Sequence, residues 1–234
     1  MSKDGAMSTK EYYKRLLDRD EDIFREITRF SEKEAEVFDA LLKHLEKVNS
    51  ERDQFSNEEK GKALETAVSF LLENITIFKV REHLFTSTNE MDQLITLSFK
   101  GEKFREHIDI RGEFFICECK NHAVKIGVTW VGKFYSLLSC HCNLGIIFSY
   151  NGLAGSGWED GVGLTKKLFL NKEDHAKRSY ILDFNMKDLK LISKGHSFIE
   201  LLNAKMIALK TDSSYEEHIT LHPAQESGSN DDAS

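Results

Sequence analysis

The sequence predicts an α/β protein with a three-layer α/β/α core and a mixed central sheet. The main observation is the order of its hydrophobic patterns: helix, three strands, helix, strand, helix, strand, helix. A second is the run Leu144–Tyr150, whose continuous apolar composition is typical of a strand buried on both faces. With 234 residues, the chain suits one domain with an appendage.

A helical hairpin is predicted over residues 1–55, ahead of this core. Apolar residues recur at helical spacing from Glu11 to Asn49. Ser31, with Glu34 three residues later, resembles a capping box that begins a second helix. Docking on the core, dimerisation and partner binding all fit such a hairpin, and a packing arm is the favoured interpretation.

The core is predicted to span residues 56–210, beginning with a helix that opens at Ser56 and runs through Leu72. The further expected elements are strands near 75–85 and 91–99, a charged loop at 100–106, a strand within 107–120, a helix at 128–142, a strand at 144–150, a glycine-rich loop at 151–163, a helix near 160–171, a strand near 179–185 and a helix near 195–209. Residues 211–234 are acidic and serine-rich, which predicts a disordered tail.

The net charge of −7 is unevenly distributed along the chain. Residues 1–60 carry −4, residues 61–210 carry +3 and residues 211–234 carry −6. The middle segment therefore permits contact with a polyanion without requiring it. No apolar run is long enough to span a membrane and the first thirty residues are charged throughout, so a cytoplasmic protein without a signal peptide is expected.

The four cysteines form two pairs, Cys117 with Cys119 and Cys140 with Cys142. In a cytosolic protein these are reduced thiols or metal ligands rather than disulfides. Their Cys-x-Cys spacing is a poor match to a zinc site, so apolar packing is the favoured interpretation.

Glu118 and Lys120 are the most informative residues of the chain. They alternate with Cys117 and Cys119 on a predicted strand, so Glu118 and Lys120 point to the same face of the sheet. A charged pair in an otherwise apolar strand is costly unless it binds something, and a divalent metal and a phosphate would explain it.

Asp92 on the preceding strand would complete such a site. Its carboxylate, that of Glu118 and the backbone oxygen of Cys119 would bind Mg²⁺ or Mn²⁺, which prefer oxygen ligands. Lys120 would orient the water or stabilise the scissile phosphate, and Glu65 would approach from the helix before the sheet.

These residues resemble the motifs of the PD-(D/E)xK nuclease superfamily, and most closely those of Mrr-like restriction endonucleases. The resemblance covers about residues 58–209 and implies a restriction-endonuclease-like fold. It also implies that Asp92 and Glu118 are metal ligands, that Lys120 is the catalytic lysine and that Glu65 is an accessory acid. Two departures are that Met91 replaces the proline of the family name and that a charged insertion at 100–113 lengthens the link between the motif strands.

Each of these residues also has a structural interpretation. Glu118 and Lys120 would form a salt bridge on an exposed face, Asp92 would be a turn or edge-strand acid, and Glu65 a surface helix residue. Glu90 is the fallback carboxylate. The remaining candidates are His122, interpreted as structural, Trp130, Phe134 and Tyr135, interpreted as core packing, and Trp158 in the glycine-rich loop, interpreted as a contact to DNA or a partner.

The resulting expectation is a Mg²⁺-dependent DNA endonuclease, by resemblance one of bacterial restriction or anti-phage defence. A homo-oligomer of at least two chains is expected, because cutting two strands favours a dimer, and an ATPase or another defence subunit is a plausible partner. One alternative is a nuclease-fold module that binds DNA or an assembly partner without cutting. A further alternative is an α/β scaffold with no role in nucleic-acid chemistry.

Overall fold

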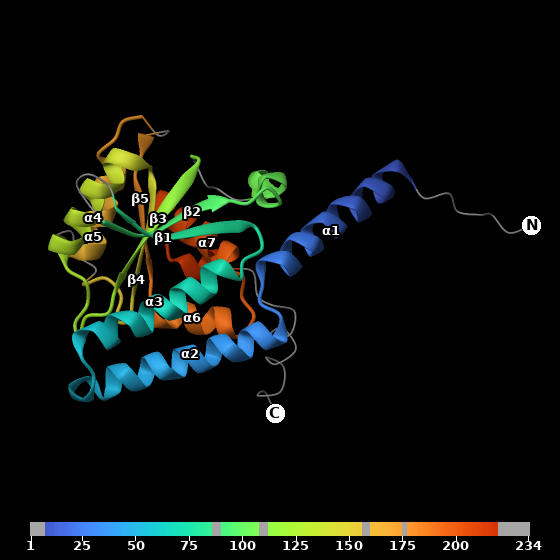
Figure 1. Ribbon diagram of the computed structural model, residues 1–234. Coiled ribbons are helices and arrows are strands. Elements are labelled where there is room, and N and C mark those ends of the chain that lie inside the picture. The colour runs from blue at the N-terminus through green and yellow to red at the C-terminus, as the bar shows by residue number, and fades with distance from the viewer. Residues whose placement is uncertain (1–7, 86–89, 108–111, 156–159, 175–176, 220–234) are drawn as a thin grey trace, which may run out of the picture.

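The computed structural model describes residues 8–85, 90–107, 112–155, 160–174 and 177–219, and it has an α/β fold. One open five-stranded sheet lies at its centre, with helices on both faces (Figure 1). The strands lie side by side in chain order: β1 (Phe78–Phe85), β2 (Glu90–Leu97), β3 (Phe114–Lys120), β4 (Leu144–Ser149) and β5 (Tyr180–Phe184). β1, β2 and β3 are antiparallel neighbours, whereas β4 and β5 run parallel to β3, so the predicted mixed sheet is confirmed.

One face of the sheet is covered by α4 (Val128–His141) and α5 (Gly161–Leu170), which connect the parallel strands. Phe134 and Leu138 of α4 pack with Ile116 and Ile147 of the sheet. Gly145 permits this close approach, because a Cβ atom at that position would lie 2.6 Å from the ring of Phe134. The two layers are therefore in contact at the middle of the sheet.

The opposite face is covered by α3 (Asn57–Glu73), α6 (Met186–Ser193) and α7 (Phe198–Thr211), with α2 (Glu32–Ser50) packed against α3 and α6. α3 begins at Ser56, where a capping box with Glu59 forms. The buried α2 residues Phe38, Leu42, Leu45 and Val48 belong to the same hydrophobic cluster as α3 and the sheet. The second N-terminal helix is therefore part of the main core.

The predicted hairpin is wrong, although both of its helices are present. α1 (Thr9–Thr28) projects from the body of the molecule, whereas α2 runs along α3 (Figure 1). The physical reason is that the buried apolar residues of α2 pack against the core rather than against α1, and the end of α1 docks elsewhere. At the other end of α1, Tyr12 and Tyr13 are 52% and 56% exposed.

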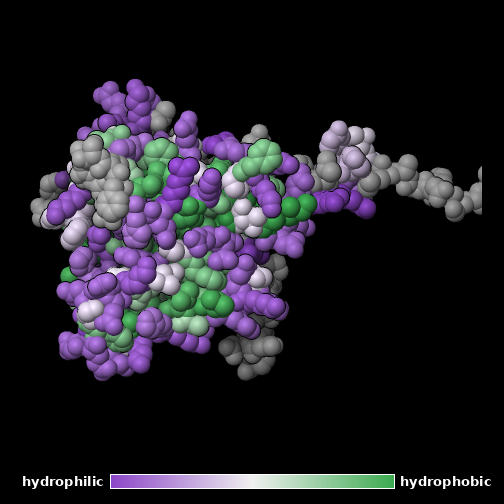
Figure 2. All heavy atoms as spheres, viewed as in Figure 1, coloured by the Kyte–Doolittle hydropathy of each residue, from purple (hydrophilic) through white to green (hydrophobic). Residues whose placement is uncertain are grey.

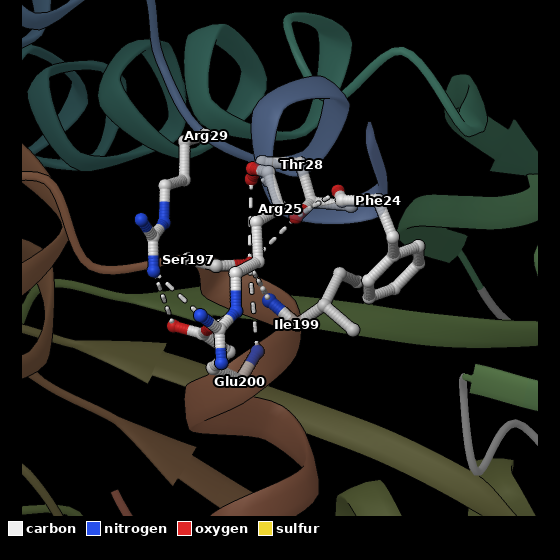
Figure 3. Close-up of polar contacts among 7 residues, drawn as sticks. All are labelled: Phe24, Arg25, Thr28, Arg29, Ser197, Ile199 and Glu200. Atoms are coloured by element: carbon white, nitrogen blue, oxygen red, sulfur yellow. Dashed lines mark hydrogen bonds and ion pairs between the residues drawn. The ribbon is translucent and has the colours of Figure 1, made fainter. Parts of the chain in front are cut away.

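The last turn of α1 docks on the start of α7 through polar contacts (Figure 3). The buried hydroxyls of Thr28 and Ser197 lie 3.1 Å apart, and Ser197 also caps α7. The guanidinium of Arg29 donates to both oxygens of Glu200, each at 3.2 Å. These contacts fix where the chain enters the core.

Several smaller elements differ from expectation. α6 was not predicted, and Gly101–His107 forms a 3-10 helix where a loop was expected. The strand expected within 107–120 begins at Phe114. The chain beyond α7 forms a 3-10 helix, Tyr215–His218, which packs against α7, so the disorder predicted from residue 211 is wrong as far as residue 219; residues 220–234 lie outside the described residues.

The surface is mostly hydrophilic on the face shown in Figure 2, where hydrophobic side chains appear only in small areas between polar ones. In the part of the chain that the structure describes, every helix is too short or too polar to cross a membrane. Most buried apolar residues of the described chain are gathered in two clusters, one on each face of the sheet.

Candidate active site

The predicted site residues gather at the carboxyl end of β3. β2 runs antiparallel to β3, so Asp92 near the start of β2 lies beside Glu118 and Lys120 at the end of β3. β4 is parallel to β3, and the loop that leads from β3 into α4 leaves from the same edge. Ligands of α/β proteins commonly bind at this edge of the sheet.

Lys120 lies between the two carboxylates. Its Nζ atom is 2.6 Å from Oε1 of Glu118 and 3.9 Å from Oδ2 of Asp92. The exposed fractions of the Lys120, Glu118 and Asp92 side chains are 22%, 19% and 22%. The salt bridge considered for Glu118 and Lys120 does form, but in a partly buried position rather than on an exposed face.

Asp92 is held in place by the backbone of β3. The N–H of Cys119 donates to Oδ2 of Asp92 at 2.8 Å. The pairing of β2 with β3 ends at Gln93 and Cys117. The Asp92 carboxylate therefore accepts the backbone N–H of Cys119, which lies just beyond the last paired residues of the two strands. The Cys119 group that contacts Asp92 is thus its N–H, whereas its backbone oxygen as a metal ligand remains a prediction.

The carboxylates border two different spaces. Glu118 lines a pocket on the α4 side of the sheet. Asp92 lines a narrow space of about 10 Å³ on the α3 side, together with Glu65 and Cys119. Glu65 of α3 thus approaches Asp92, as predicted, whereas Glu118 borders the other side of the sheet and Lys120 lies between the two carboxylates. A role of Glu65 at the site remains a prediction.

The donor chemistry fits a hard divalent cation. Mg²⁺ commonly uses one or two protein carboxylates and completes its coordination with water and substrate phosphate. Asp92 and Glu118 provide that number, with Glu65 beside Asp92. Among the described residues, no group of three or more His, Cys, Asp or Glu side chains converges on one metal position.

The charges of the site favour a protonated lysine and neutral thiols. Burial opposes the charge of Lys120, but the charge and hydrogen bond of Glu118 and the charge of Asp92 raise the pKa of Lys120 above the ordinary lysine value. Burial raises the pKa values of the Cys117 and Cys119 thiols well above normal, so both remain protonated. They pack in the hydrophobic cluster beneath the sheet, as the packing interpretation expected.

The loop after Lys120 is held by three side chains that sequence reasoning missed. Arg52, just after α2, donates to the backbone oxygen of Asn121 at 2.9 Å, and Asn121 in turn donates to the backbone oxygen of Lys60 at 2.7 Å. Asn151, after β4, donates to the backbone oxygen of His122 at 3.0 Å. The available signal was an asparagine shortly after each of two parallel strands, Asn121 directly after β3 and Asn151 two residues after β4.

Trp130 has a different environment from the one expected. Phe134 is 4% exposed and packs in the core as predicted, but Trp130 is 38% exposed. Both lie on the same face of α4. Trp130 is one turn nearer the start of the helix, where the sheet no longer covers this face. Its ring lies 4.7 Å from Nζ of Lys133, 5.5 Å from Nζ of Lys120 and 5.2 Å from the ring of His122.

His122 is a neutral neighbour of this group. Burial and then the positive charges of Lys120 and Arg52 lower the pKa of His122, which keeps its imidazole uncharged at neutral pH. The other residues considered as accessory groups, Trp158 and the side chain of Glu90, lie outside the described residues.

Comparison with protein-family models, with curated proteins and with solved structures finds no significant match to this chain.

Proposed function

We propose that the chain is a metal-dependent endonuclease that hydrolyses phosphodiester bonds in DNA and has a restriction-endonuclease-like core. The observation that carries this proposal is that Nζ of Lys120 lies within ion-pair distance of both Asp92 and Glu118 at one end of β3. The element order supports it: α3 precedes three antiparallel strands, and α4 leads into a strand parallel to the third.

To hold one cation, the carboxylates of Asp92 and Glu118, which border different spaces, would turn toward a common point beside Lys120. Glu65 and the backbone oxygen of Cys119 would be further ligands on the α3 side. A bound Mg²⁺ supplies Lewis acidity and lowers the pKa of a coordinated water. The ammonium of Lys120 is placed to donate a hydrogen bond to a phosphate oxygen, because it is charged and lies between the acids.

The start of α4 adds a second favourable feature for phosphate. Its N-cap residue, Gly127, makes no side-chain capping bond, and its first turn contains no acidic residue. The positive end of the helix dipole is thus not offset by the protein's own side chains. By the resemblance, we also propose a role in bacterial restriction or anti-phage defence, as an oligomer or beside an ATPase subunit.

The test is cleavage of plasmid DNA in Mg²⁺ or Mn²⁺ by the parent protein and by Lys120→Ala. We expect metal-dependent cleavage by the parent and a loss of about 100-fold or more in the variant, the usual cost of removing one group that stabilises transition-state charge. Lys79→Ala is the matched control, because Lys79 is an exposed lysine on β1 at the opposite end of the sheet. It should cut like the parent.

DNA binding measured on the same variants separates this proposal from its alternative. A parent protein that binds DNA but never cuts DNA or RNA with either metal would contradict the nuclease and support a non-cleaving module. Equal cleavage by the parent and Lys120→Ala would exclude the proposed catalytic role of Lys120.

A further inference from the structure

A pocket of about 150 Å³ opens directly beside Glu118 and Lys120, between the sheet and α4. Ile126, Phe134, Leu137 and Ile147 form the apolar part of its lining, and Glu118, Lys120, Trp130 and Lys133 form the rest. A cavity of this size is large enough for one planar ring, since an apolar cavity of about 150 Å³ can hold benzene. The proposed chemistry of Lys120 and Glu118 requires no apolar pocket, so the pocket calls for a separate explanation.

The rim of the pocket combines an aromatic ring with positive charge. Trp130 and Lys133 line it together with Lys120, and the two ammonium groups lie 4.7 Å and 5.5 Å from the indole ring. Aromatic side chains next to lysines are the usual means of binding single-stranded nucleic acid, because bases stack on the ring and phosphates contact the cations.

Apolar side chains are also exposed around this rim. Val124 is 72% exposed and Val128 is 41% exposed, and both lie in the segment that leads from β3 into α4. With Trp130, they place three exposed apolar side chains within seven residues, next to the proposed catalytic lysine. An unstacked base would cover part of this surface.

We propose that this pocket receives one unpaired nucleobase of the substrate, stacked against Trp130, so that the enzyme cuts a strand beside a nucleotide that is out of the double helix. This inference rests on the proposed nuclease function and names its substrate class. A base that remains paired in a duplex cannot enter the pocket, whereas one in a single strand enters without the cost of unpairing. The hydrocarbon part of the lining offers no donors or acceptors to a base edge, so the main preference is for an unpaired base rather than for a sequence.

The binding test uses the tryptophan itself. The chain has two tryptophans, so Trp158→Phe leaves Trp130 as the only one. This protein is titrated without divalent metal against a single-stranded oligonucleotide, its abasic counterpart of equal length and the corresponding blunt duplex. We expect the single strand to quench Trp130 fluorescence, and the abasic strand and the duplex to quench it far less.

Variants measure the contribution of the ring. Trp130→Ala should weaken binding of the labelled single strand about 5- to 150-fold, the range that corresponds to about 1–3 kcal/mol for one stacked base. Trp130→Phe retains a ring and should keep most of the affinity. Phe99→Ala is the matched control, because Phe99 is 86% exposed and follows the end of β2 that lies away from the site. It should leave the affinity unchanged.

The cleavage arm distinguishes failure of this inference from failure of the proposed function. With Mg²⁺, the parent should cut single-stranded or unpaired sites at least about 10-fold faster than paired ones, and Trp130→Ala should reduce that ratio. Equal quenching by the abasic strand, or cleavage of duplex and single strand at equal rates, would overturn the inference while leaving the nuclease intact. Base-dependent quenching without any cleavage would instead overturn the proposed function and retain the base pocket.

Discussion

Asp92 has two roles: its carboxylate binds the backbone at the end of β3, and it carries one of the negative charges of the site. One of its oxygens accepts the N–H of Cys119 and also lies 3.9 Å from the ammonium of Lys120. The carboxylate therefore has a fixed orientation before any ligand binds. A pre-positioned ligand loses less side-chain entropy on binding a cation than a free one does.

Asp92→Asn separates these two contributions. The amide oxygen of asparagine can still accept the N–H of Cys119, so we expect the variant to fold with a stability within about 1 kcal/mol of the parent. Loss of the negative charge should weaken Mn²⁺ binding at least about 10-fold, as measured by electron paramagnetic resonance of the free ion. Asp39→Asn, at a side chain 48% exposed on α2, is the control and should bind Mn²⁺ like the parent. Unchanged Mn²⁺ affinity in Asp92→Asn would exclude Asp92 as a ligand.

The sequence predicted part of this site because strand geometry is regular. Alternation along an extended chain placed Glu118 and Lys120 on one face, and their ion pair confirms that placement. It did not predict the bond from Cys119 to Asp92, because that bond depends on where the ladder between β2 and β3 stops. Nor did it predict the exposure of Trp130. Helical spacing shows which face of α4 carries the residue, but not how far along α4 the sheet covers that face.

Helix starts set the positions of several elements in the fold. Ser31, Ser56, Asn185 and Ser197 each cap a helix with a side-chain hydrogen bond. Ser197 differs from the others because its hydroxyl is fully buried and also lies 3.1 Å from the hydroxyl of Thr28. The start of α7 and the end of α1 are thereby joined at one point.

Ser197→Ala should lower the free energy of unfolding by about 1–2 kcal/mol. It removes the cap of α7 and leaves the buried Thr28 hydroxyl without that partner. Urea denaturation followed by circular dichroism measures the change. Ser136→Ala is the control, since the exposed Ser136 hydroxyl bonds only within α4; a change of the same size there would show that the loss at Ser197 is not specific to the cap.

The element that sequence reasoning missed had a readable signal. α6 begins with a capping box between Asn185 and Asp188, the same device that marked the helices at Ser31 and Ser56. Its apolar residues span only eight positions, too few for a periodic pattern to stand out from the strand before it. By contrast, β4 was predicted closely because all six of its residues are buried and apolar or small.

At the scale of the whole molecule, α2 and the central β-sheet share one hydrophobic cluster. Leu45 of α2 is fully buried, and Leu64 and Leu71 of α3 are no more than 1% exposed. Exposure of one layer would therefore expose the other. The fold is expected to lose α2 and the sheet in a single step.

Leu45→Ala should lower the free energy of unfolding by about 2–5 kcal/mol, the usual cost of a cavity at a fully buried leucine. Far-ultraviolet circular dichroism and tryptophan fluorescence should still report one coincident transition. Val37→Ala, on the same helix at 47% exposure, is the control and should change stability by no more than about 0.5 kcal/mol. Two separate transitions in the parent would contradict a shared core.

Arg52 connects the N-terminal region to the proposed site. It lies at the junction of α2 and α3, and its guanidinium holds the backbone of Asn121, the residue that follows Lys120. A shortened chain beginning at Ser56 would lose the hydrogen bond from Arg52 to Asn121. It would also lose the hydrophobic side chains that α2 packs against the core. The smallest fragment that preserves both the packing and the shape of the proposed site therefore starts at α2, ahead of every residue proposed to touch the phosphate.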